Sequence, residues 1–120
     1  MQDLRRRLLE LHREIVAAER EDFELMNGKV GAAEFLRVLV EDQRFEWLRP
    51  LSALIVQLDE QEEEGADASA QEAWLAEARR LLKPDAAGVA FQRHYAELIE
   101  RRPQVLYAHG AVMQALKKPV

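Results

Sequence analysis

The segment from Trp47 to Leu58 constrains the fold more than any other part of the chain. It reads W-L-R-P-L-S-A-L-I-V-Q-L, and Arg49 is its only charge. A surface helix carries an apolar stripe about 100° wide, but the apolar residues here point to almost every side. We therefore predict a central helix enclosed over nearly its whole circumference, by other helices of the chain or by a second copy of it. The apolar positions are Leu48, Leu51, Ala53, Leu54, Ile55, Val56 and Leu58.

Pro50 indicates where this central helix begins. A proline inside a helix costs roughly 3 kcal/mol or more, but it is tolerated in the first turn, where backbone amides have no helical partner. We therefore predict that the helix starts near Glu46 or Trp47 and ends at about Glu63, after a bend at 42–44. One helix from Phe45, kinked at Pro50, remains an alternative.

Composition favours a single all-helical domain. The chain has 120 residues, of which 48% are hydrophobic, and only five Gly and four Pro, which leaves little material for a turn-rich β protein. Because cysteine is absent, disulfides and zinc–thiolate sites are excluded. We predict one domain over 1–120, folded as an up-and-down helical bundle of four main helices plus one or two shorter ones.

Further helices follow from apolar residues spaced three and four apart. We expect them at 2–26, 32–41, 70–83, 85–101 and from Pro103 onward, with a flexible linker at about 64–69. Gly28 is expected to end the first, Ser69 and Glu72 to form a capping box, and Pro103 to occupy a first helical position. In the second helix, we expect Phe35, Leu36, Leu39 and Val40 to face inward.

Charge and hydropathy point to a cytoplasmic protein. Charged residues interrupt the leucines that follow Arg5–Arg7, so no signal peptide is expected, and no apolar run approaches the roughly 18 residues of a membrane span. The net charge of −5 equals the five acids of the segment 59–64, so the acidity is local. That segment is either a solvated helix end or a docking surface for a basic partner.

Four residues form a candidate polar cluster. His109 lies in an apolar row between Val105 and Val112, which is typical of a hydrogen-bonded core histidine. His12, Glu19 and Asp22 flank the apolar row of the first helix, and if they converged with His109 they would form a divalent-cation or acid–base pocket. Apart from this conditional pocket, we predict no bound metal ion and no cofactor.

The sequence offers two further kinds of binding site. Trp47 and Arg49 are candidates for a pocket that takes an anionic ligand, although a buried tryptophan and an arginine paired with Glu46 would explain both. We do not expect nucleic acid as a partner, because its binding needs one contiguous basic face. The basic residues of this acidic chain occur only as short clusters. These clusters are Arg5–Arg7, Arg79–Arg80, Arg101–Arg102 and Lys117–Lys118.

The segment F45-E-W-L-R-P-L-S-A-L-I-V-Q-L-D-E60, with L11-H-R-E14 and A108-H109, resembles uncharacterised short bacterial all-helical proteins that carry W-L-R-P-L-S-x-L-I-x-x-x-D-E. The resemblance covers most of the chain and implies helix boundaries, but no activity.

The surplus of apolar surface on the first and central helices favours a non-enzymatic structural or protein-interaction module that self-associates, with a dimer favoured. The alternatives are a small metal-binding or acid–base enzyme using the polar cluster, and a nucleic-acid-associated adaptor.

Overall fold

The computed structural model describes residues 1–117, which form six α-helices and one 3₁₀ segment and contain no strand. The all-α prediction is therefore confirmed. The elements are α1 (Gln2–Asn27), α2 (Ala32–Glu41), η1 (Gln43–Leu48), α3 (Arg49–Glu64), α4 (Ala68–Leu81), α5 (Ala90–Arg101) and α6 (Pro103–Lys117).

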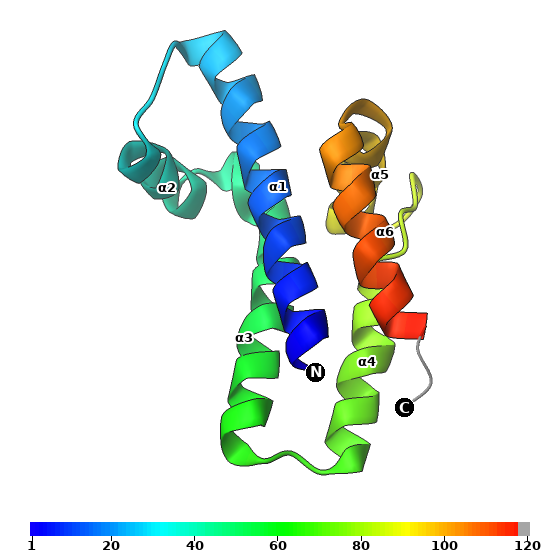
Figure 1. Ribbon diagram of the computed structural model, residues 1–120. Coiled ribbons are helices and arrows are strands. Elements are labelled where there is room, and N and C mark those ends of the chain that lie inside the picture. Colours follow the sequence, from blue (N-terminus) through cyan, green and yellow to red (C-terminus); the bar gives the residue numbers. More distant parts are fainter. Residues whose placement is uncertain (118–120) are drawn as a thin grey trace.

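The helices form four antiparallel columns (Figure 1). The first column is α1, the second is η1 followed by α3, the third is α4 followed by α5, and the fourth is α6. The chain runs up and down through them, so that α1 packs between α3 and α6, and α4 contacts the same two helices. The short helix α2 lies outside the columns and packs against η1. This arrangement is the bundle that the sequence predicts, with two columns broken into two pieces.

The apolar row of α1 enters the core over most of the helix. Leu8, Leu11 and Ile15 are fully buried, as their spacing predicts. The row ends in Leu25, which is 83% exposed, because the last turns of α1 extend beyond the other columns (Figure 1). Burial therefore follows the sequence pattern only where neighbouring helices are present.

Pro50 lies in the first turn of α3, as expected. The 3₁₀ segment η1 precedes that turn, and the Asp42 side chain accepts a hydrogen bond from the backbone N–H of Arg44 at its start. The α-helix thus begins at Arg49, slightly later than predicted. Trp47 and Leu48 are buried in η1 and not in the α-helix.

Within residues 1–117, the central helix α3 is covered on one side only, so the helices of this chain do not by themselves give the near-complete enclosure that the sequence predicts. Leu51, Leu54 and Leu58 are at most 2% exposed, whereas Val56 is 54% exposed and Ala53 is also exposed. Its neighbours α1 and α4 both lie on the buried side. Within the described chain, nothing covers the opposite face.

The start of α4 also differs from the sequence prediction. The N-cap of α4 is Asp67, whose side chain accepts from the N–H of Ala70 at 2.8 Å, so Ser69 lies inside the helix and forms no capping box. Helices α3 and α4 both extend into the predicted 64–69 linker, leaving only residues 65–67 between them.

The start of α5 lies later than predicted, at Ala90, because Asp85 forms a turn. Its carboxylate accepts from the N–H of Ala87 at 2.9 Å, so residues 85–89 are not helical. Gln92 then joins the two halves of this column. Its amide donates to the carbonyl oxygen of Arg80 at 2.9 Å, and its side-chain oxygen accepts from the N–H of Val89 at 3.0 Å.

Helix α2 buries one aromatic ring and leaves two aliphatic side chains outside. Phe35 is buried between Phe23 and Phe45, with ring centroids 5.5 and 5.7 Å away. Leu36 and Val40 are 59% and 64% exposed, so the prediction that they face inward is wrong. A ten-residue helix held mainly by one ring cannot bury both of its sides.

Candidate functional site

The four residues of the predicted polar cluster do not converge on one pocket. His12, on α1, shares a hydrogen bond between its Nε2 and the Oγ of Ser52 on α3, at 3.1 Å. His109, on α6, is bonded instead to Tyr95 on α5. The two histidines thus serve different helix pairs. Among residues 1–117, no group of three His, Asp or Glu side chains is placed to hold a metal ion.

Glu19 and Asp22 are the only members of the cluster that the structure brings together. Asp22 pairs with Arg101 and Arg102 from the junction of α5 and α6. Burial, and then the negative charge of Asp22, raises the pKa of Glu19 above its ordinary value. The arginines oppose this effect but do not outweigh it. The group joins the end of α1 to the α5–α6 corner.

The Tyr95–His109 pair is the most enclosed polar contact between two side chains in the core. Tyr95 is fully buried, and its Oη lies 2.6 Å from the Nδ1 of His109. Burial lowers the pKa of His109 and raises that of Tyr95, so both groups are neutral near pH 7. The tyrosine hydroxyl therefore donates to Nδ1, and the proton of the neutral imidazole lies on Nε2.

Trp47 lies beside an open hollow, but Arg49 is not among the residues that line it. The indole stacks on the ring of His94, with centroids 4.9 Å apart and planes 16° apart. The hollow has a volume of about 730 Å³, and Phe91 and Val89 add to its apolar wall. Arg49 points to solvent and pairs with Glu46 at 3.8 Å. The predicted Trp47–Arg49 anion pocket is therefore not formed.

The stacking of Trp47 on His94 is not predicted from the sequence, because residue spacing does not show that η1 and α5 are neighbours. The only available signal is that His94 follows Phe91 by one helical turn and shares its face. With Arg44, the stacked pair separates this hollow from a smaller one of about 240 Å³ beside the end of α1. The walls carry aromatic rings but no arrangement of nucleophile and base.

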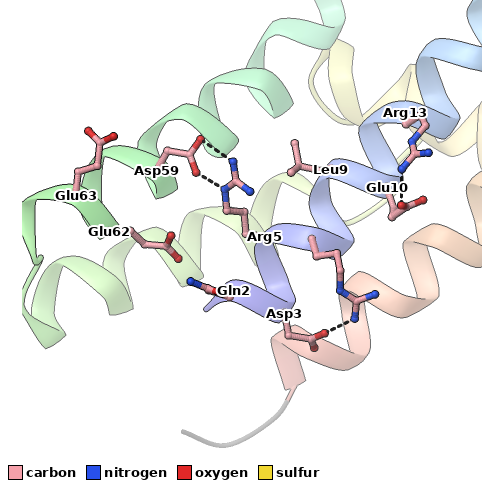
Figure 2. Close-up of a pocket in the computed structure, with 10 residues that line it drawn as sticks. Gln2, Asp3, Arg5, Leu9, Glu10, Arg13, Asp59, Glu62 and Glu63 are labelled. Atoms are coloured by element: carbon pink, nitrogen blue, oxygen red, sulfur yellow. Dashed lines mark hydrogen bonds and ion pairs between the residues drawn. The ribbon is translucent and has the colours of Figure 1, made fainter.

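A third hollow lies between the first half of α1 and the second half of α3, and its volume is about 930 Å³ (Figure 2). Leu9 points into it from α1, and the ion pair between Arg5 and Asp59 crosses it. This pair lowers the pKa of Asp59. Glu62 and Glu63 border the hollow from α3 and make no ion pair within the described chain.

The arginines of the basic clusters form ion pairs and hydrogen bonds within the chain. Arg5 pairs with Asp59, Arg6 and Arg7 with Asp3, and Arg80 with Glu77. Arg79 donates two hydrogen bonds, from Nε and Nη2, to the carbonyl oxygen of Leu116. Arg101 and Arg102 bind the acids at the end of α1. Lys117 is exposed, and Lys118 lies outside the described residues. Within residues 1–117, the arginines of these clusters therefore have partners in the same chain.

Uncovered apolar side chains occur at several places besides the end of α1. They are Leu9 in the first half of α1, Leu36 and Val40 on α2, Val56 on α3, Val89 just before α5, and Leu106 and Tyr107 on α6. Single exposed apolar residues are normal, but on α2 and α6 they occur as pairs on one helix. No helix of residues 1–117 combines the length and the hydropathy that crossing a bilayer requires.

Comparisons of the chain with protein-family models, with curated proteins and with solved structures gave no match. The resemblance to short bacterial proteins carrying the W-L-R-P-L-S segment therefore stays a prediction. What the structure supports of it is a small all-helical fold.

Proposed function

We propose that the protein is a helical interaction module that associates with a second copy of itself. One observation carries this proposal: the middle of the outer side of α3 is apolar, at Ala53 and Val56, and nothing in the described chain covers it. Val56 is 54% exposed there, between Ala53 and Gln57, which are also exposed. An apolar middle on the outer side widens the apolar surface of α3 beyond what its neighbours in the chain cover, so a partner surface is expected over Ala53 and Val56.

The rival functions have less support. An acid–base or metal-dependent enzyme needs titratable groups that converge in one pocket, and His12 and His109 are bonded to different helix pairs. A nucleic-acid adaptor needs unpaired cations on one face, and the arginine clusters bind carboxylates or backbone carbonyls of the same chain.

Light scattering coupled to size-exclusion chromatography tests the proposal. The chain has a mass of 13.8 kDa, and we expect the measured mass to rise toward twice that value as the protein concentration increases, because association follows mass action. A mass that stays at the monomer value over the whole accessible concentration range would overturn the proposal. Sedimentation velocity on the same samples separates a dimer from larger assemblies.

A further inference from the structure

The contacts between α1 and α3 fix which residues lie side by side on the outer face of these two helices. Arg5 pairs with Asp59 near one end, and His12 bonds to Ser52 about two turns further along. Because the helices are antiparallel, Leu9 lies level with Ile55, midway between these two contacts, and within one residue of the level of Val56. Leu9 is 38% exposed and Val56 is 54% exposed, so the middle of the face is apolar and open to solvent.

Charges of opposite sign lie on either side of this apolar middle. Along the outer side of α3, Arg49, Ala53, Val56, Glu60 and Glu63 follow one another at intervals of three or four residues, so they form one stripe. All five are exposed. The stripe therefore carries one cation at its N-terminal end, Arg49, which also pairs with Glu46 at 3.8 Å. Its middle is apolar and its C-terminal end is acidic.

Four of the five positions of this stripe are complementary when it is turned end for end, and the fifth, Glu63, falls opposite Glu46. If two copies of α3 pack antiparallel about a point midway between Leu54 and Ile55, Ala53 of each lies opposite Val56 of the other. About the same point, Arg49 of each copy lies opposite Glu60 of the other. A two-fold axis therefore creates two apolar contacts and two ion pairs at once, as an isologous interface requires.

We propose that this face of α1 and α3, centred on Leu9, Ala53 and Val56, binds the same face of a second copy in antiparallel orientation, with Arg49 of each copy opposite Glu60 of the other. The inference rests on the proposed self-association and adds its geometry. The hollow of about 930 Å³ at the acidic end of the face leaves room for long side chains of the partner (Figure 2). Glu62 and Glu63 at its edge are available to them.

The other uncovered faces lack this complementarity. The outer side of α6 carries Leu106, Tyr107, Gly110 and Gln114, and its one charge within the described chain is Lys117 at the end. Two copies of that face would bring no opposite charges together. On α2, the exposed pair Leu36 and Val40 lies on a helix of only ten residues. These faces are the alternative sites that an experiment must separate from α3.

Charge reversal at two positions tests the proposal. In Arg49→Glu alone, or Glu60→Arg alone, both ion pairs of the dimer become like-charge pairs, so each variant should dimerise at least about tenfold more weakly than the wild type. Mixing the two variants should restore dimers. In a mixed pair, the introduced glutamate of one chain lies opposite the introduced arginine of the other, and the remaining Arg49 lies opposite the remaining Glu60. The double variant in one chain should also dimerise normally. Both positions are exposed, and Arg49→Glu removes only a solvent-exposed pair with Glu46 in the monomer, so folding should change little.

Sedimentation equilibrium gives the dimerisation constants, and circular dichroism verifies the folding of each variant. Arg93→Glu on α5 is the matched control, since Arg93 is exposed and far from the stripe in sequence, and it should leave dimerisation unchanged. If the wild type associates but the two single variants associate equally well, the α3 interface is wrong while self-association stands. Loss of association in Tyr107→Ser would then assign it to α6. A wild type that stays monomeric overturns both proposals.

Discussion

Replacing Tyr95 with phenylalanine should destabilise the protein by about 1–2 kcal/mol, because it removes a single buried hydrogen bond and little volume. The hydroxyl is 2.6 Å from the Nδ1 of His109, and Tyr95 is fully buried. Without the hydroxyl, Nδ1 has no donor. His109 is partly exposed, so water can replace some of the lost bond, which keeps the cost below the maximum for an unsatisfied buried group.

This cost translates into a measurable shift of the melting temperature. A domain of 120 residues gains about 0.25 kcal/mol/K of entropy on unfolding, so the expected decrease is roughly 4–8 °C. Tyr107→Phe is the matched control, because Tyr107 is 85% exposed and its hydroxyl makes no hydrogen bond within the described chain. Its effect should lie within about 0.5 kcal/mol of zero. Urea unfolding followed by circular dichroism measures both.

The Tyr95–His109 hydrogen bond also predicts how the stability of the protein depends on pH. Burial lowers the pKa of His109 below its ordinary value of 6.5 in the folded state, so the unfolded chain takes up this proton first as the pH falls. The contribution of His109 to the free energy of unfolding is therefore fully present above pH 6.5. It is lost as the pH falls from there through the folded-state pKa. A phenylalanine ring has no hydroxyl to occupy the lone pair of Nδ1, so the Tyr95→Phe variant should lose less stability than the wild type over that range.

Burial also lowers the pKa of His12, but this contribution is present in both proteins and cancels in their difference. Two results would refute the reasoning. One is a Tyr95→Phe variant as stable as the wild type at neutral pH. The other is an equal loss in Tyr107→Phe, which would show that the loss does not come from the buried bond.

Two further substitutions test the core and an exposed helix position. Trp74→Phe should cost about 2–3 kcal/mol, because the indole N–H of this buried residue donates to the carbonyl oxygen of Leu54 at 2.9 Å and the smaller ring leaves a void; a loss under about 0.5 kcal/mol in urea unfolding would contradict this. Gly110→Ala should raise stability by about 0.5–1 kcal/mol, because Gly110 lies inside α6 and an added Cβ meets no atom within 4 Å. A lower melting temperature would show that this glycine is needed for a contact outside the described chain.

Local chemistry explains most of what the sequence predicts correctly. The first helix is expected at 2–26 and found at Gln2–Asn27, and the second is expected at 32–41 and found at Ala32–Glu41. Periodicity and the terminating glycine act within a few residues, so the sequence contains them directly. The same holds for Pro50 and Pro103, whose missing N–H restricts each to a first turn.

Local competition explains where the predicted boundaries are wrong. Asp67 and Ser69 can both cap a helix, and the structure uses Asp67. Asp85 is expected at a helix start but accepts a hydrogen bond in a turn, so α5 begins only after Val89. In both cases more than one position near the boundary could start the helix. Which one does so depends on how the next helix packs, and that information is not local.

The sequence by itself determined an all-helical bundle, because helix formers in periodic apolar rows bury their surface only by packing together. Only the tertiary structure decided which sides of those helices face one another. It separated His12 from His109, stacked Trp47 on His94, and left Val56 exposed on the outer side of α3. The physical reason is that periodicity gives the direction of a side chain around its own helix, whereas convergence depends on the order and register of different helices.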